Sequence, residues 1–182
     1  MTFEVILGII LAGILSNNYA LLHFLGTGAV IENERSSRRS LIVGAGTTVI
    51  MVLTTLITWP INKYLLANAS YLRILVFVIV VMGVAELVHL LAKKHIEGYC
   101  HVYTPTFVIN GAVLGLCIHN TEILFGEALV TAFGVGLGFT ITMVVFGALH
   151  SKLDEESIPK AFRGLPITLL LAGLIALALL AF

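Results

Sequence analysis

Two parts of this chain, 92 positions apart, repeat one another. Residues 108–120 (VINGAVLGLCIHN) align with residues 16–28 (SNNYALLHFLGTG), and the alignment continues without a gap. Ten of 35 aligned positions are identical: Asn18 with Asn110, Ala20 with Ala112, Leu22 with Leu114, Ile31 with Ile123, Val43 with Val135, Gly44 with Gly136, Gly46 with Gly138, Thr48 with Thr140, Met51 with Met143 and Val52 with Val144. Identity at one fixed offset indicates an internal duplication. The alternative is that membrane helices share glycine, threonine and valine through composition alone.

Six apolar stretches divide the chain. Hydrophobic residues make up 59% of it and charged residues 11%, which is typical of an integral membrane protein and leaves little for a soluble domain. A span needs about 20 apolar residues, and the candidate spans are 3–24, 41–59, 72–91, 103–118, 124–149 and 166–182. We therefore predict an all-α polytopic membrane protein with residues 1–182 in a single transmembrane domain. The first stretch lacks a basic n-region and a cleavage site, so we expect a retained helix.

The basic residues predict the orientation of these spans. The connections after the first, third and fifth spans hold Arg35, Arg38, Arg39, Lys93, Lys94, Lys152, Lys160 and Arg163, whereas the opposite side holds only Lys63 and Arg73. Because basic residues stay on the cytoplasmic side, both termini are expected to be extracytoplasmic. Ten basic and ten acidic residues balance, so the net charge gives no indication of a nucleic-acid partner.

The duplication and the topology together predict an inverted repeat. Each copy, about 1–92 and about 93–182, contains three spans, so the second copy enters the membrane from the opposite face. Such folds place their working site near the midplane, where broken helices expose helix ends. We expect breaks in the first span at Asn17 and Asn18, and in the fourth span around Pro105 and at Asn110 and Gly111. The alternative is that these asparagines only join helices by hydrogen bonds.

Five runs of residues resemble a known family. They are NNYALLHFLG from Asn17, NGAVLG from Asn110, GF at Gly138 ahead of Phe146, IPKAFRG from Ile158 and AGL from Ala172. They are similar to the small six-helix membrane subunits of the Rnf and Nqr redox complexes, and most similar to the Rnf A / Nqr E type.

This resemblance implies a multi-pass subunit of the bacterial inner membrane that pairs in the lipid bilayer with an inverted homologous subunit. Between them the two subunits of the family hold a [2Fe-2S] cluster at mid-membrane. The cluster lies on the electron route between a cytoplasmic NADH or ferredoxin side and flavin subunits outside, and the complexes couple electron flow to Na+ or H+ movement.

The chain departs from the family at the cluster ligands. The family places one cysteine two residues after the LG of the first motif and another directly after the Asn of the second, where this chain has Gly28 and Gly111. Clusters of this kind need thiolate ligands, or thiolates with histidines, and glycine supplies neither. We therefore expect that the chain does not hold the cluster in the family's way.

The remaining cysteines and histidines offer a displaced metal site as an alternative. Cys117 lies six residues beyond Gly111, or about 9 Å along a helix. Together with His119, and with His23 from the first copy, it would form such a site in a dimer. Against this, a cysteine at a helix end is more often a small buried apolar residue.

An acidic residue lies inside the third span. Glu86, in VMGVAELVHLL, is about 7 Å from the predicted cytoplasmic end, and His89 is one turn further on the same face. A carboxylate at the bilayer centre costs roughly 2.5 to 3.5 kcal/mol, so such residues usually face a cavity, a partner or a conducted ion. The resemblance adds an acid at the matching place of the family. Ion handling is one interpretation; pairing with His89 or Lys93 is the other.

Two functions follow from these patterns. The first is a membrane subunit of an Rnf/Nqr-type electron-transfer complex coupled to Na+ or H+ translocation, beside other redox subunits. The second is a stand-alone homodimeric transporter or channel that uses the vacated midplane space for a small substrate or ion. Retention of motifs along the whole chain favours the first, and the two glycines favour the second. We see no phosphate loop, catalytic triad or metalloprotease helix, so no independent catalytic site is predicted.

Overall fold

The computed structural model describes residues 3–14, 37–67, 69–95, 110–153 and 158–179, and the elements in these ranges are all helical. The α-helices are α1 (Phe3–Ile14), α3 (Ser37–Pro60), α4 (Arg73–His95), α6 (Gly111–His119), α7 (Phe125–Ser151) and α8 (Leu165–Leu179). Shorter turns are the π-helical η1 (Ile61–Leu65) and the 3-10 turns η2 (Ser70–Leu72), η4 (Asn120–Glu122) and η5 (Lys160–Phe162).

Three helical segments of the described chain are long and apolar enough to cross a membrane. They are Ser40–Leu65, Ser70–Ala92 and Phe125–Ser151. The helices Phe3–Ile14 and Leu165–Ala178 are apolar but shorter. The all-α, multi-pass character predicted from the sequence is thereby confirmed, whereas six complete spans stay a prediction, because residues 15–24 and 103–109 of two predicted spans lie outside the described residues.

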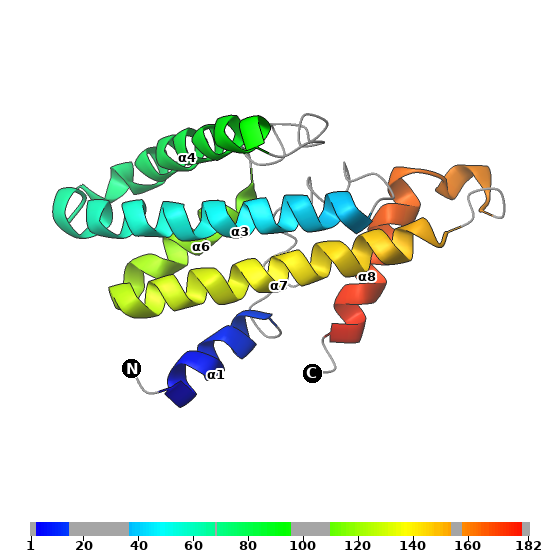
Figure 1. Ribbon diagram of the computed structural model, residues 1–182, viewed down its shortest axis with the longest axis horizontal. Coiled ribbons are helices and arrows are strands. Elements are labelled where there is room, and N and C mark those ends of the chain that lie inside the picture. The colour runs from blue at the N-terminus through cyan, green and yellow to red at the C-terminus, as the bar shows by residue number, and fades with distance from the viewer. Residues whose placement is uncertain (1–2, 15–36, 68, 96–109, 154–157, 180–182) are drawn as a thin grey trace.

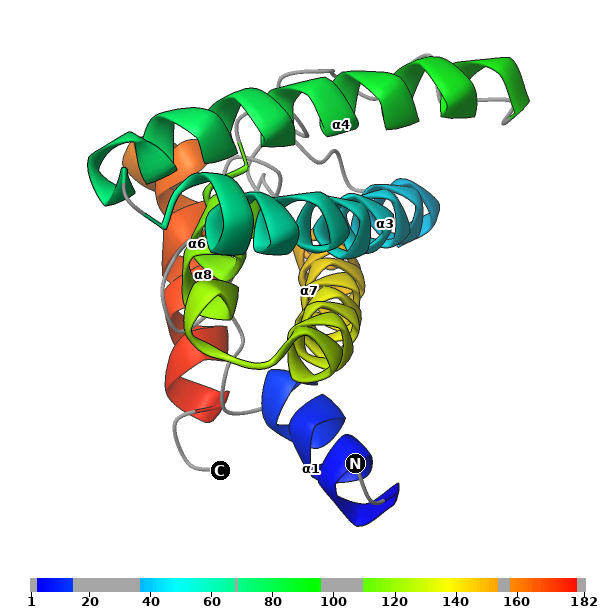
Figure 2. The same ribbon diagram turned by 90° about the vertical axis from the view of Figure 1, so that its left-hand side faces the viewer.

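Helices α3 and α7 form the centre of the fold. They lie side by side and run in opposite directions (Figure 1), and the view along them shows α4 beyond α3 and α1 beyond α7 (Figure 2). The end of α3 meets the start of α7, because the rings of Trp59 and Phe125 lie 5.1 Å apart. At the other end, Ser40 of α3 lies against Gly147 of α7. The two helices therefore stay in contact over most of their length.

The crossing of α3 and α7 is built from reciprocal glycine and threonine contacts. A Cβ atom added to Gly44 would lie 2.7 Å from the Cα of Thr140, and one added to Gly136 would lie 2.6 Å from the Cγ2 of Thr48. The two threonine hydroxyls are 2.9 Å apart, so that one donates a hydrogen bond to the other. Small residues let helix backbones approach closely where hydrophobic driving force is absent. The hydroxyl contact joins two positions that the repeat aligns, and the offset of 92 positions converts one glycine–threonine contact into the other.

Helix α1 packs on the opposite side of α7 in a similar way. Added Cβ atoms on Gly13 and on Gly134 would lie 2.7 Å and 2.9 Å from backbone atoms of the facing helix, and one on Gly138 would lie 2.7 Å from the carbonyl oxygen of Gly13. Glycines on both faces of α7 therefore hold α3 and α1 at close range.

Four buried threonine hydroxyls of α3 are satisfied within the helix. The hydroxyls of Thr47, Thr48, Thr54 and Thr58 donate to the carbonyl oxygens of Val43, Gly44, Ile50 and Thr54, at 2.9, 3.0, 2.7 and 2.8 Å. This bonding to the carbonyl four residues earlier is the usual solution for threonine in an apolar helix. These four hydroxyls thus need no partner from another helix.

The core lies between α3, α4, α6 and α7, and α4 is the least covered of the long helices. The largest fully buried side chains are Phe77, Phe139, Phe146, Ile50, Met51, Leu116, Met143, Val113 and Val135. In the candidate span that contains α4, only 22% of the most apolar stretch is buried, compared with 50% and 56% in the spans that contain α3 and α7. Exposed leucines and isoleucines such as Ile74, Ile79 and Leu87 make this outer face suited to lipid or to another subunit.

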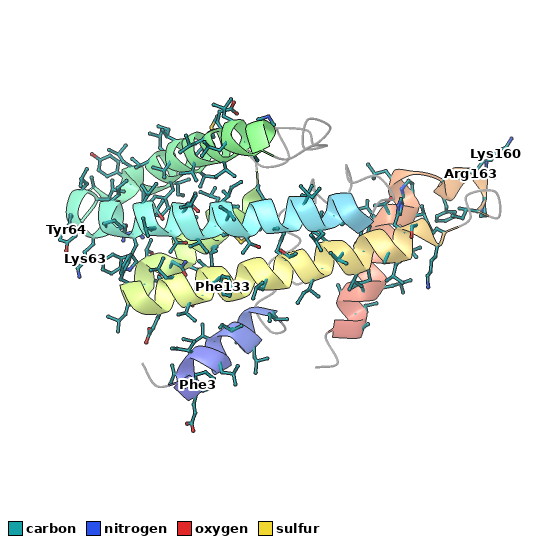
Figure 3. The ribbon with its side chains drawn as sticks, viewed as in Figure 1. Phe3, Lys63, Tyr64, Phe133, Lys160 and Arg163 are labelled. Atoms are coloured by element: carbon teal, nitrogen blue, oxygen red, sulfur yellow. The ribbon has the colours of Figure 1, made fainter. Side chains whose placement is uncertain are left out.

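The two ends of the long axis carry basic residues that the sequence assigns to opposite sides of the membrane. Figure 3 shows Lys63 with Tyr64 at one end, and Lys160 with Arg163 at the other. Residues predicted to lie on opposite sides of the membrane are therefore at opposite ends of α3 and α7, and which end faces the cytoplasm stays a prediction.

Candidate functional site

The second half of the predicted midplane site lies at the start of α6. Asn110 is the N-cap of this helix, with extended backbone angles (φ −95°, ψ 103°), and its Oδ1 accepts a hydrogen bond of 3.0 Å from the backbone N–H of Ala112. Such a cap satisfies one of the orphan N–H groups of a helix start. Gly111, the first helical residue, is half-buried. Helix α6 therefore begins at Gly111, and the predicted break of the fourth span stays a prediction, because residues 103–109 lie outside the described residues.

The Asn110 side chain is buried and retains an unused donor. It is 3% exposed, and its Nδ2 group has no hydrogen-bond partner within the described part of the chain. A buried amide N–H without an acceptor is energetically unfavourable, and such groups are rare in folded proteins. The matching half of the predicted site, Asn17, Asn18 and Gly28, lies outside the described residues.

Cys117 lies in the packed interior between α6 and α3. Its side chain is 1% exposed, and its thiol is within hydrogen-bond reach of the hydroxyls of Thr54 and Thr58. His119, two residues further, is exposed to the outside of the bundle. Within the described ranges no group of three or more histidine, cysteine, aspartate or glutamate side chains is placed to hold a metal ion. The third member of the displaced site, His23, is not among the described residues.

Glu86 and His89 occupy different environments on α4. Glu86 is exposed on the outer surface of the helix, whereas His89 is half-buried. Neither a hydrogen bond nor an ion pair joins Glu86 to another described side chain, and the side chain of Lys93 is outside the described set. The carboxylate therefore faces the surroundings of the bundle, where lipid or another subunit would meet it.

Asn120 is a buried polar residue that the sequence did not single out. It is 2% exposed, and its Nδ2 donates to the hydroxyl of Thr55 at 3.2 Å and to the carbonyl oxygen of Ala128 at 3.3 Å. These two bonds tie η4 to both α3 and α7. The available signal was its position at the end of an apolar stretch, where an amide often closes a helix.

A pocket of about 320 Å³ was also missed by the prediction from sequence. It lies at the rim of the bundle, and its lining residues are Trp59, Asn62, Lys63, Thr121, Glu122, Ile123 and Leu124. The Nε1 group of Trp59 donates to the carbonyl oxygen of Ile123 at 3.0 Å, and the ammonium of Lys63 lies 4.8 Å from the centre of the Trp59 ring system. The pocket joins segments about sixty residues apart, so no local motif encodes it; a tryptophan at a span end was the one visible signal.

Comparison with known proteins gives consistent matches along the whole chain. Residues 6–182 match the family model described as "Rnf-Nqr subunit, membrane protein". The chain is 33% identical over 181 residues, 96% of it and 94% of the relative, to the A-type subunit of the ion-translocating oxidoreductase complex of Syntrophotalea carbinolica. With the same coverage it is 32% identical to the A-type subunit of the Na(+)-translocating ferredoxin:NAD(+) oxidoreductase complex of Acetobacterium woodii. It is 33% identical, again with that coverage, to the corresponding ion-translocating oxidoreductase subunit of Azoarcus sp..

Proposed function

Because this chain belongs to the Rnf-Nqr family of membrane subunits, we propose that it serves as the A-type subunit of an ion-translocating electron-transfer complex. The observation that carries this proposal is the match, over 96% of this chain, to relatives whose names describe that role. The apolar helices α3, α4 and α7 agree with it, because such a subunit works within the bilayer. Electron carriers would then be supplied mainly by other subunits of the assembly.

The proposed architecture is two inverted three-span repeats, about 1–92 and about 93–182, in one transmembrane domain. Two observations support it. Helices α4 and α8 begin at Arg73 and Leu165, which are 92 positions apart. In the antiparallel pair α3 and α7, Gly44 contacts Thr140 and Gly136 contacts Thr48. The offset of 92 positions converts the first contact into the second. A twofold relation in the membrane plane produces this reciprocity.

The proposed working site lies where the two repeats break, at Asn17, Asn18 and Gly28 in the first copy and Asn110 and Gly111 in the second. The capped start of α6 supports it, because a helix N-terminus at this point presents N–H groups and a buried amide. Glycine at Gly111 leaves room for close approach by another backbone or a ligand.

The residues of this site do not fit the [2Fe-2S] cluster of the family. The resemblance implies that Gly111 stands where the family has a cysteine, and glycine has no side-chain ligand. Cys117, the nearest cysteine on α6, lies in the packed interior against Thr54 and Thr58. We therefore propose that the chain contributes scaffold and ion path to its complex and not cluster ligands, and we assign no electron-transfer step to it.

Glu86 and His89 are the proposed ion-handling residues. An exposed carboxylate on a helix with an apolar surface is unfavourable in lipid, so in the assembled protein it requires a polar neighbour, an aqueous path or a bound cation. A neighbouring subunit that packs on the open face of α4 would supply such surroundings.

The proposed placement is the bacterial inner membrane, with both termini extracytoplasmic and an inverted homologous subunit, or a second copy of this chain, as partner. The position of Lys63 opposite Lys160 and Arg163 supports this topology. The second candidate function is a stand-alone homodimeric transporter or channel. The glycine at Gly111 favours it, because the space of the missing thiolates would admit a small substrate.

Affinity purification of the full chain from its native membranes, followed by native mass spectrometry, separates these functions. The expected result is co-purification with several different subunits that carry redox cofactors, in equal stoichiometry. A homodimer without other subunits would contradict the complex-subunit function and favour the transporter. A cysteine pair introduced at the two membrane rims, one near Lys63 and one near Lys160, would test the topology by labelling with a membrane-impermeant reagent from each side.

A further inference from the structure

The rim pocket sits where two membrane-spanning helices end. The candidate spans Ser40–Leu65 and Phe125–Ser151 finish and begin beside it, and η1 and η4 form its walls. Tryptophan at this depth is typical of the interface between hydrocarbon and headgroups. A volume of about 320 Å³ falls at the lower end of the range of small-ligand sites. The pocket therefore has the position and the size to receive the polar part of a lipid.

The pocket carries one positive and one negative side chain. Lys63 and Glu122 both line it, both are exposed, and no ion pair joins them in the described structure. The ammonium of Lys63 is placed over the ring of Trp59, where a cation–π interaction holds it at the wall. A ligand that carries a separated anion and cation would pair with both groups, whereas a simple anion would pair with Lys63 and be repelled by Glu122.

A further polar side chain of the pocket favours a ligand that donates a hydrogen bond. Asn62 lines the same pocket, and its Oδ1 atom is buried without a hydrogen-bond partner within the described ranges. A buried unpaired acceptor is unfavourable, and an N–H donor entering the pocket would relieve it. A primary ammonium carries such donors, but a quaternary ammonium does not.

We propose that this pocket binds the headgroup of a phospholipid of the phosphatidylethanolamine type. The phosphate pairs with Lys63, and the primary ammonium pairs with Glu122 and donates to Asn62. Leu65 and Leu124, which are 73% and 69% exposed beside the pocket, lie along the acyl chains. The site is separate from the proposed midplane site and independent of the redox assignment.

The fluorescence of Trp59 reports directly whether a lipid occupies the pocket, because Trp59 is the only tryptophan in the chain. The full chain is reconstituted in nanodiscs of phosphatidylcholine that contain a low mole fraction of a test lipid with brominated acyl chains, which quench indole on contact. The test lipids are phosphatidylethanolamine, phosphatidylglycerol and phosphatidylcholine. We expect brominated phosphatidylethanolamine to quench Trp59 at a mole fraction about two- to fivefold lower than either other lipid.

Substitutions in the pocket test whether the preference for phosphatidylethanolamine arises there. Lys63→Gln and Glu122→Gln are each expected to reduce the preference for phosphatidylethanolamine about two- to fivefold, with the quenching of each variant normalised to its own unquenched emission. The controls Lys152→Gln and Glu4→Gln, at exposed sites away from the pocket, leave it unchanged. Equal quenching by phosphatidylglycerol would overturn the role of the ammonium, and equal quenching by phosphatidylcholine would overturn the role of its N–H donors. A preference that survives both pocket variants would overturn the site itself.

Discussion

Replacing Gly136 with alanine tests whether α3 and α7 are held at the distance that the glycine and threonine contacts require. The new Cβ would lie 2.6 Å from the Cγ2 of Thr48 and 3.0 Å from its Cα, so the helices must separate or shift. Overpacking of this kind costs about 1–3 kcal/mol. Alanine is also a better helix former than glycine by about 1 kcal/mol. Gly136→Ala is thus expected to lower the free energy of unfolding by up to about 2 kcal/mol.

Gly83→Ala is the matched control, because nothing lies within 4 Å of its added Cβ. It carries the same gain in helix propensity without the clash, so the difference between the two variants isolates the overpacking cost of about 1–3 kcal/mol. Thr48→Ser removes the Cγ2 atom and keeps the hydroxyl. In the Gly136→Ala background it is expected to restore part of the loss.

Reversible unfolding in mixed micelles of increasing SDS content, followed by far-UV circular dichroism, measures these differences. Four proteins form a cycle: the parent chain, the two single variants at positions 48 and 136, and the double variant. If the Gly136→Ala and Gly83→Ala variants had their unfolding midpoints at the same SDS fraction, the close contact would be refuted. Simple additivity of the two changes at positions 48 and 136 would refute it too, since contacting residues must couple.

Three further predictions concern the proposed working site and ion path. Asn110→Ala is expected to lose about 0.5–2 kcal/mol of stability because it removes the N-cap acceptor, whereas Asn110→Ser keeps it; equal SDS midpoints for the two would contradict the capping role. Glu86→Gln is expected to reduce ion uptake by proteoliposomes of the purified complex while leaving the unfolding midpoint in place, and unchanged uptake would assign Glu86 to a structural role. The isolated chain is expected to lack stoichiometric iron and acid-labile sulfide; about half a [2Fe-2S] cluster per chain, detected by electron paramagnetic resonance after reduction, would show that other ligands replace the missing cysteines.

Long apolar helices were predictable from the sequence because their signal is continuous. The stretch predicted at 124–149 is α7 (Phe125–Ser151), and the stretch at 72–91 lies within the segment Ser70–Ala92. The prediction for α3 was shorter at the start, because Arg38 and Arg39 lower the local hydropathy although the helix continues through them. The sequence predicts a break of the fourth span at Asn110 and Gly111 but not that Asn110 caps a helix, which the structure shows at the start of α6.

Contacts between distant segments were not predictable. The repeat identified Gly44 with Gly136 and Thr48 with Thr140 as equivalent positions, but equivalence does not say which residues touch. In the fold each glycine meets the threonine of the other copy, because the two helices run antiparallel. The rim pocket was missed for the same reason, since its walls come from either side of that antiparallel pair.

The self-contained hydrogen bonding of α3 has a consequence for biosynthesis. Its partner α7 starts 65 residues after Pro60, where α3 ends, so α3 enters the bilayer well before the surface that will cover it has been translated. Thr47 and Thr58 already donate to carbonyl oxygens of their own helix, and this bonding needs no neighbour. These hydroxyls therefore need no partner from α7 while the second half is still being made, whereas the Nε1 group of Trp59 meets its acceptor, the carbonyl oxygen of Ile123, only afterwards.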